Sequence, residues 1–445
     1  MDNLRIALDA IQISPKDWEF SDVRLSIPPL SFGSDAANSH TQYSNAVARL
    51  NGKNLTGRGM TFTLGEGNQF VCEAAKFIVD SLEGRTFADL LENPRGFHEL
   101  LTNPSQLRWI SPYSGLPMMA AGLVINTLID AAAEKAQLPA WKFLSLLESE
   151  YLLGLVALRH LPPEETSAFA KILEASQIGV RERCEALGDS KLPVYFTTWI
   201  GHSAEEIAAQ ITQQHDERDI ALFKLKVGPN IDLDFKKLKR IRALIAPGIS
   251  LAVDANQTLT FDEACTWMGL LSDLRVVWLE EPFAPDNVTL FRNLAEEKER
   301  RSWSCEIATG ENCPNTQTAY ELVRGGLDRF QSDPCRMMGL PDGMVTALIA
   351  HGRAVAFTPH AGGAGLDELS PHLQLFNLAR VDITTDPEDT LTETIGFCSH
   401  LYENPIRVEN GSAFAPDSPG LGVRFEASIE SRIRDYREGI TWLEL

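Results

Sequence analysis

Charged side chains recur at the ends of short apolar segments in the second half of the chain. In DIALFKLKVGPN, residues 219–230, Lys224 and Lys226 lie among apolar residues. Because alternate residues of a strand point to the same side, both ammonium groups face one way. Later segments end in residues that can bind a cation or move a proton, namely Asp254, Glu280, Glu281, Glu311, Asp333 and His360.

Acidic residues end three successive segments, at Asp254, at the pair Glu280 and Glu281, and at Glu311. Such a set offers only hard oxygen donors, which predicts a Mg²⁺ site, with Mn²⁺ as the alternative. Without a cation, three neighbouring carboxylates repel one another. The structural alternative is that each acid caps a helix or pairs with an arginine. That alternative does not explain why the acids recur at the same point of each segment.

The basic residues have the types needed for acid–base chemistry. A lysine beside another cation and away from water has a lowered pKa, so Lys224 and Lys226 could provide a base and a carboxylate-binding partner. The alternative is two lysines whose ammonium groups extend to solvent. His360 follows one segment after Asp333, which can hydrogen-bond a ring nitrogen and fix the tautomer. A structural role is the alternative for this histidine.

The elements that must position these residues are strands alternating with helices. Apolar strands are predicted at residues 192–200, 221–228, 249–256, 276–282, 305–311, 329–334 and 354–362, with amphipathic helical stretches between them. This alternation predicts an α/β fold with parallel strands. The length of the series, and the lack of a glycine-rich dinucleotide turn after the first strand, favour a closed barrel. Its strand ends would form one cup.

The same pattern divides the chain into three parts. Residues 1–150 show strands, a polar loop and helical stretches, which predicts a separate α+β domain. Residues 151–400 carry the repeating strands and helices. Residues 401–445 are rich in turns and are expected to run back over the surface to the N-terminal domain.

Composition narrows the classes of partner and compartment. The formal net charge of −21 argues against nucleic-acid and membrane partners. The seven cysteines form no CxxC pair, and the N-terminus does not have the pattern of a signal peptide. No run is expected to span a membrane. These features predict a reduced, cytoplasmic protein.

Several ordered motifs carry a family resemblance. FKLKVG, VDANQ, WLEEPFAPDN, TGEN and PHAGGAGLDEL, with GSDAANSHTQYS, GRGMTFTLGEGN and SQLRWISP nearer the N-terminus, resemble the enolase superfamily. Within it they look like the mandelate-racemase-like subgroup and its fuconate and galactonate dehydratases. The likeness spans about residues 20–420. It implies a modified TIM barrel, (β/α)7β, with an N-terminal α+β capping domain.

The resemblance also implies a reaction and a role for each motif residue. A Mg²⁺-dependent hydro-lyase of this kind abstracts the proton α to a carboxylate and eliminates the β-hydroxyl, giving a 2-keto-3-deoxy sugar acid. The implied metal ligands are Asp254, Glu280 and Glu311. Lys226 would be the base, Lys224 would lower its pKa, and His360 with Asp333 would protonate the departing hydroxyl. Asn256 and Glu281 are expected beside the ligands or the substrate, and a loop at residues 33–43 is expected to close over the sugar.

The sequence departs from these relatives where they carry a substrate-binding glutamate. Gly396 aligns with that acid, and Glu393 lies nearby but off register. The leading expectation is a dehydratase that takes a small sugar acid such as L-fuconate and assembles as a homo-oligomer. A racemase or epimerase of the superfamily is one alternative. A non-catalytic barrel protein with a drifted substrate site is the other.

Overall fold

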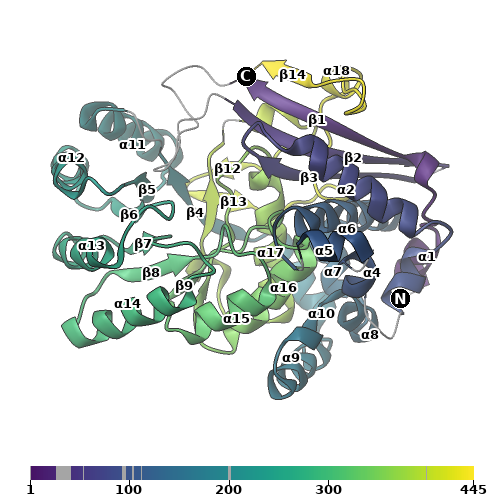
Figure 1. Ribbon diagram of the computed structural model, residues 1–445, viewed down its shortest axis with the longest axis horizontal. Coiled ribbons are helices and arrows are strands. Elements are labelled where there is room, and N and C mark those ends of the chain that lie inside the picture. The colour runs from purple at the N-terminus through teal and green to yellow at the C-terminus, as the bar shows by residue number, and fades with distance from the viewer. Residues whose placement is uncertain are drawn as a thin grey trace.

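A barrel and a smaller α+β part lie side by side in the computed structural model, as Figure 1 shows at left and right. The structure describes residues 2–26, 42–53, 55–92, 97–102, 105–111, 113–198, 202–396 and 398–444. The two parts have separate sheets, one of four strands and one built around the barrel.

Eight parallel strands form the barrel, with a helix after each of the first seven. The strands are β4 (Lys191–Thr197), β5 (Leu222–Lys226), β6 (Ser250–Asp254), β7 (Trp278–Glu280), β8 (Glu306–Thr309), β9 (Arg329–Phe330), β10 (Ala356–Phe357) and β11 (Thr392–Thr394). The helices are α11 (Ala204–Arg218), α12 (Ile231–Leu244), α13 (Phe261–Asp273), α14 (Val288–Arg301), α15 (Thr316–Arg324), α16 (Gly339–His351) and α17 (Leu366–Arg380). The predicted (β/α)7β fold is confirmed.

Strand register explains why the charged residues converge. Lys226 pairs with Asp254 across β5 and β6, and Asp254 pairs with Glu280 across β6 and β7. These three charged residues therefore form a row across the sheet, each at the last position of its strand. Glu311 follows β8 by two residues. Parallel strands in this register place their carboxyl ends at one rim of the barrel.

The eighth strand was not predicted from its own residues. β11 has only three residues, Thr392, Glu393 and Thr394, and it lacks the apolar character that marked the other strands. It pairs in parallel with β4, the first barrel strand. Several observed strands are also shorter than the apolar segments, because the ends of those segments lie in the loops that carry the site.

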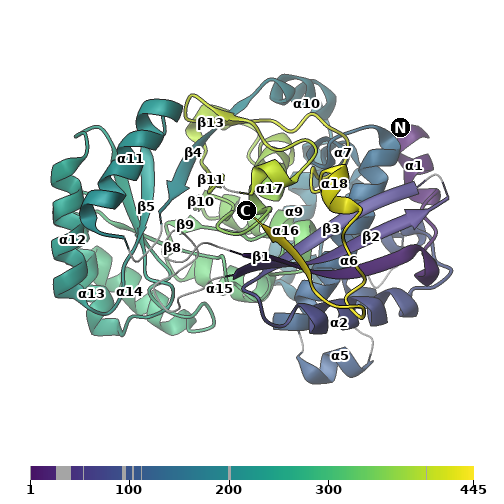
Figure 2. The same ribbon diagram turned by 90° about the horizontal axis from the view of Figure 1, so that it is seen from above.

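The N-terminal part is a sheet covered by helices. Its strands β1 (Trp18–Ser26), β2 (Gln42–Gly52) and β3 (Leu55–Thr63) run antiparallel, and β14 (Thr441–Glu444) joins β1 in parallel, as Figure 2 shows. The larger covering helices are α2 (Asn68–Ser81) and α6 (Gly115–Ala136), with the shorter helices α1 (Asp2–Asp9), α3 (Phe87–Leu91), α4 (Phe97–Thr102) and α5 (Ser105–Ile110). The last strand of the chain thus lies in the first sheet.

The remaining elements join these parts. They are α7 (Ala140–Leu146), α8 (Ser149–Leu155), α9 (Pro163–Ala175), α10 (Val180–Gly188), β12 (Val408–Glu409), β13 (Ser412–Phe414) and α18 (Ala427–Glu430). β13 pairs with the start of β4, so the C-terminal segment contacts the barrel before it reaches the N-terminal sheet. The domain boundaries at residues 150 and 400 stay a prediction.

One helix has the length and apolar composition of a membrane span, contrary to the expectation that no such run exists. This helix is α6, and most of its apolar window is buried inside the protein. It packs between the N-terminal sheet and α16, and it is apolar because it contacts protein on most sides.

Close contact between α6 and β3 gives a stability prediction. A β-carbon at Gly59 would collide with Oγ1 of Thr127 and lie 2.9 Å from the carbonyl oxygen of Leu123. Gly59→Val is expected to lower the free energy of unfolding by about 2–3 kcal/mol, measured by denaturant titration. Gly188→Val is the control, because nothing lies within 4 Å of a β-carbon there. Equal losses in both variants would contradict the packing described.

Candidate active site

Three buried carboxylates form the centre of the site. Asp254 ends β6, Glu280 ends β7 and Glu311 lies just after β8. One oxygen atom of each carboxylate lies within 4.8 Å of the others. The strand register brings these acids together although 57 residues separate the first from the last (311 − 254).

This acidic triad has the donor set of a divalent-metal site. All three side chains offer oxygen, and burial leaves little water to screen their repulsion. Burial raises the pKa of Glu280 to about 7; Lys224 lowers that pKa and Asp254 raises it. A divalent cation shared by the three oxygens would remove this cost.

The two lysines of β5 reach different acids of the triad. Lys224 Nζ lies 2.6 Å from Glu280 Oε1, and Lys226 Nζ lies 2.5 Å from Asp254 Oδ2. Burial lowers the pKa of both lysines, but the neighbouring carboxylates raise it more, so the net shift is upward. A lowered pKa for Lys226 was expected. The opposite direction arises because Asp254 raises the pKa of Lys226 by more than Lys224 lowers it.

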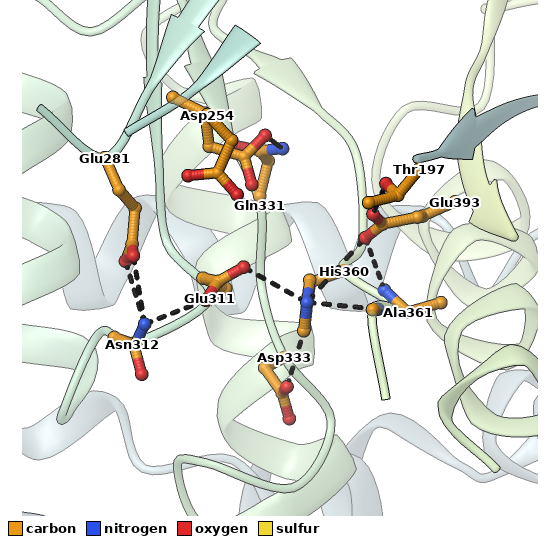
Figure 3. A network of polar contacts seen from close by, with 12 residues as sticks. Thr197, Asp254, Glu281, Glu311, Asn312, Gln331, Asp333, His360, Ala361 and Glu393 are labelled. Carbon is orange, nitrogen blue, oxygen red and sulfur yellow. Dashed lines mark hydrogen bonds and ion pairs between the residues drawn. The ribbon is translucent and has the colours of Figure 1, made fainter. Parts of the chain in front are cut away.

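His360 connects the triad to an aspartate. Its Nδ1 lies 2.8 Å from Asp333 Oδ2 and its Nε2 lies 3.1 Å from Glu311 Oε2, and Figure 3 shows the ring between these two acids. Asp333 is itself fixed, since its Oδ1 accepts hydrogen bonds from the backbone N–H groups of Cys335 and Arg336. Burial lowers the pKa of His360, but Glu311 and the other acids raise it well above the usual value.

Asn256 and Glu281 lie around the triad. Asn256 donates from its backbone N–H to Asp254 Oδ1 and from its side chain to Asp254 Oδ2, so it orients that carboxylate. Glu281 instead accepts hydrogen bonds from the side chains of Gln257 and Asn312. Its carboxylate is therefore held beside the triad by two amides, as Figure 3 shows for Asn312.

Glu393 is the site residue that the sequence reading missed. Its Oε1 lies 3.0 Å from Lys224 Nζ, and its Oε2 lies 3.8 Å from His360 Nε2. The Thr197 hydroxyl and the Ala361 backbone N–H, the latter at 2.8 Å, also donate to it. Burial raises the pKa of Glu393, but Lys224 and His360 outweigh this and lower it to about 2.

The structure thus places the Glu393 carboxylate in the site, although its alignment with the acid of the relatives stays a prediction. Alignment by motif spacing pointed to Gly396, which lies beyond β11 with a backbone φ of +64°. The position of Glu393 could have identified it, because a closed barrel needs an eighth strand and residues 392–394 follow the seven apolar segments. The predicted loop at residues 33–43 lies outside the described residues for positions 33–41.

Comparison with known proteins decides the family. A family model described as "Enolase C-terminal domain-like" matches residues 206–429. Mitochondrial enolase superfamily member 1 of Xenopus laevis is 30% identical over 437 residues, which is 96% of each chain. The chain belongs to the enolase superfamily. L-galactonate dehydratase of Hypocrea jecorina is 29% identical over 435 residues, covering 95% of this chain and 94% of the relative.

A solved structure agrees with this assignment. The crystal structure of human mitochondrial enolase superfamily member 1 superposes with a TM-score of 0.87 at 29% identity, covering 96% of this chain and 97% of that one. The resemblance inferred from the motifs is thus confirmed. Membership of the enolase superfamily, together with its dehydratase relatives, identifies the chain as an enzyme of the hydro-lyase class. The oxygen atoms of Asp254, Glu280 and Glu311 lie close enough together to hold one divalent metal ion.

The neighbouring acids Glu280 and Glu281 provide a matched test of the metal site. We expect Mg²⁺ or Mn²⁺, added after treatment with a chelator, to stabilise the protein by about 2–3 kcal/mol at a hundredfold excess over Kd. Glu280→Gln should lose most of this gain in thermal unfolding experiments. Glu281→Gln should keep it, because Gln257 and Asn312 hold that carboxylate. Equal losses in the two variants would contradict the assigned triad.

Proposed function

We propose that this enolase-superfamily enzyme is a Mg²⁺-dependent dehydratase of a sugar acid, with L-fuconate or a stereochemical relative as substrate. The observation that carries the proposal is that two proton-transfer groups contact different members of one acidic triad. Lys226 lies beside Asp254, and His360 lies beside Glu311. A carboxylate substrate at the triad would have a base and an acid within reach from two directions.

In the first step, the neutral amine of Lys226 takes the proton α to the carboxylate. The electron pair of the broken C–H bond then forms an enediolate. Lys224 is fully buried, and its ammonium group lies next to the triad, where it can stabilise this developing negative charge. Fixed charges in a dry site cost little reorganisation when the charge forms.

In the second step, the enediolate electron pair expels the β-hydroxyl group. His360 donates its Nε2 proton to that oxygen, the C–O bond breaks, and water leaves. Asp333 holds Nδ1, so the Nε2 proton is the one available to the substrate. Glu393 and Asp333, neither of which is a proposed metal ligand, also raise the pKa of His360 and so favour the charged ring that an acid requires. The enol product then tautomerises to a 2-keto-3-deoxy acid.

The metal proposed for the triad is Mg²⁺, with Mn²⁺ as the alternative. Three carboxylate oxygens and no nitrogen or sulfur ligand suit Mg²⁺ best. When bound, Mg²⁺ would supply a Lewis acid for the enediolate and would compete with Lys226 for Asp254. If its contact with the Asp254 carboxylate is weakened, Lys226 has a lower pKa and can accept a proton near neutrality.

Glu393 supports a complete substrate site. Its carboxylate contacts Lys224 on one side and approaches His360 on the other, so it can keep both cations oriented toward the same substrate. The missing acid at Gly396 was the main reason to consider a non-catalytic barrel. That reason is removed, since an acid from β11 reaches the site.

Racemisation or epimerisation is the second candidate. A base and an acid that reach one carbon from opposite sides can also exchange its proton with inversion. The contacts of Lys226 and His360 with different triad members permit that outcome. The two reactions differ in product, because only dehydration releases a keto acid.

Substitutions at the two proton-transfer residues test the mechanism. Lys226→Met is expected to lower dehydration by about 10³-fold or more and to abolish exchange of the α-proton in deuterated water. His360→Asn should lose dehydration but keep α-proton exchange, since Lys226 remains. Lys236→Met and His400→Asn, at exposed positions, are the controls. Full activity of Lys226→Met would show that the base is wrongly assigned.

The substrate is tested with a panel of mono- and diacid sugars and an assay for 2-keto-3-deoxy products. L-fuconate and L-galactonate form a matched pair, because L-fuconate is the 6-deoxy form of L-galactonate. We expect turnover of at least one of the pair in the presence of Mg²⁺. Exchange at the α-carbon without release of a keto acid would favour the racemase or epimerase instead. Neither turnover nor exchange with any acid would contradict the proposed function.

A further inference from the structure

The strand that carries Glu393 is held weakly by its own backbone. β11 has three residues and forms its ladder with β4 on one side. On the other side, no ladder joins β11 to β10 within the part of the chain that the structure describes. Yet the Glu393 carboxylate must be placed within about half an ångström to keep productive contacts in an active site. Some other contact must fix the exit of β11.

Asp367 makes that contact. Its carboxylate accepts hydrogen bonds from the backbone N–H of Gly396 at 2.8 Å and of Ile395 at 3.3 Å. The hydroxyl of Thr394 adds a longer contact at 3.4 Å. All three donors follow Glu393 directly in the chain, so one carboxylate anchors the whole segment that leaves β11.

Asp367 is itself rigidly placed. It lies in the first turn of α17, and every residue of that helix is buried. Three residues later, the Ser370 hydroxyl donates to the backbone carbonyl of His360. The same helix turn therefore holds both the loop of His360 and the segment after Glu393. The Ala361 N–H closes the loop by donating to Glu393 Oε2.

Burial of this carboxylate indicates a specific role. A buried carboxyl group is expensive unless hydrogen bonds compensate for it, and the hydrogen bonds that Asp367 accepts from the described residues come from the segment after Glu393. An apolar side chain would fill the same space in α17 without that cost. What an apolar residue could not do is fix the backbone N–H groups of residues 395 and 396.

We propose that Asp367 is the positioning residue for Glu393: it fixes the exit of β11 and thereby sets the contact of Glu393 with Lys224. Asp367 does not touch the triad and is not a catalytic residue. The activity tests below rest on the proposed dehydratase function. A second measurement, amide hydrogen exchange, does not depend on any substrate.

A double-mutant cycle tests the coupling. Asp367→Asn keeps the shape of the side chain but leaves it a single acceptor oxygen for the N–H groups of Ile395 and Gly396. It should lower kcat about tenfold, while KM changes less than about threefold. Glu393→Gln should lower kcat at least as much. When Asp367→Asn is added to Glu393→Gln, kcat should fall by less than about a further twofold, because both changes remove the same interaction. Multiplied effects in the double variant would overturn the proposal.

Glu368→Gln is the matched control. Glu368 is the next residue of α17, is also buried, and accepts a hydrogen bond from the Ile406 N–H at 2.7 Å, away from β11. It should change kcat less than about twofold. If Glu368→Gln lowered kcat as much as Asp367→Asn, substitution of any buried carboxyl group in α17 would have the same effect. The proposal would then fail.

Asp367→Glu provides a second test in case Asp367→Asn does not fold. It keeps the charge but displaces the carboxylate by one methylene, so its kcat should fall between those of the wild type and Asp367→Asn. Wild-type kcat in Asp367→Glu would show that the position of the carboxylate does not matter, which contradicts the proposal.

Amide exchange separates this inference from the proposed function. Asp367→Asn should speed exchange at Ile395 and Gly396, whereas Glu368→Gln should speed exchange at Ile406. Unchanged exchange at 395 and 396 would overturn the inference even if dehydration is confirmed. The predicted exchange pattern in a protein that dehydrates no sugar acid would instead leave the anchor in place and refute the function.

Discussion

Repulsion among buried carboxylates is the constraint on which the site depends. Asp254, Glu280 and Glu311 offer oxygens within 4.8 Å of one another where water cannot screen them. The protein offsets part of this cost with Lys224, Lys226 and His360, each of which contacts at least one of the three. A divalent cation would offset the rest. The lysine and histidine side chains that stabilise the buried acids are also the groups proposed to take part in catalysis.

The barrel makes this arrangement from backbone register. Each acid of the row occupies the last position of a parallel strand, and the ladder pairs each of these positions with its neighbour. The groups proposed to move protons come from both places, Lys226 from a strand and His360 from the loop after one. The loops need separate fixation, and they receive it from buried hydrogen bonds such as those of Asp333 to the backbone of Cys335 and Arg336.

Much of this arrangement could be predicted from the sequence, for a physical reason. Apolar runs that end in a charged residue mark both the strand and the rim of the barrel, so Lys226, Asp254 and Glu280 identified the fold and the site together. Their roles stay predictions. Glu393 could not be found this way, because a three-residue strand of threonines and an acid carries no apolar signal.

The direction of the lysine pKa shifts was also beyond the sequence. It depends on the balance of the neighbouring charges, and only the coordinates show that Asp254 Oδ2 lies 2.5 Å from Lys226 Nζ. Motif spacing pointed to Gly396, whereas the acid that reaches the site is Glu393, because spacing in a loop is not fixed by a ladder. The weaknesses of the sequence reading therefore fall where backbone pairing is short or absent.

The pairing of β14 with β1 has a consequence for biosynthesis. The fourth strand of the N-terminal sheet consists of residues 441–444, so its register with residues 23–26 can form only after the barrel between them has been synthesised. The N-terminal sheet is therefore completed later than the barrel segment that separates its two parts. Contacts this distant in sequence slow folding. Until β14 has been synthesised, the edge of β1 is open to other strands, and a chaperone that covers this edge would protect it.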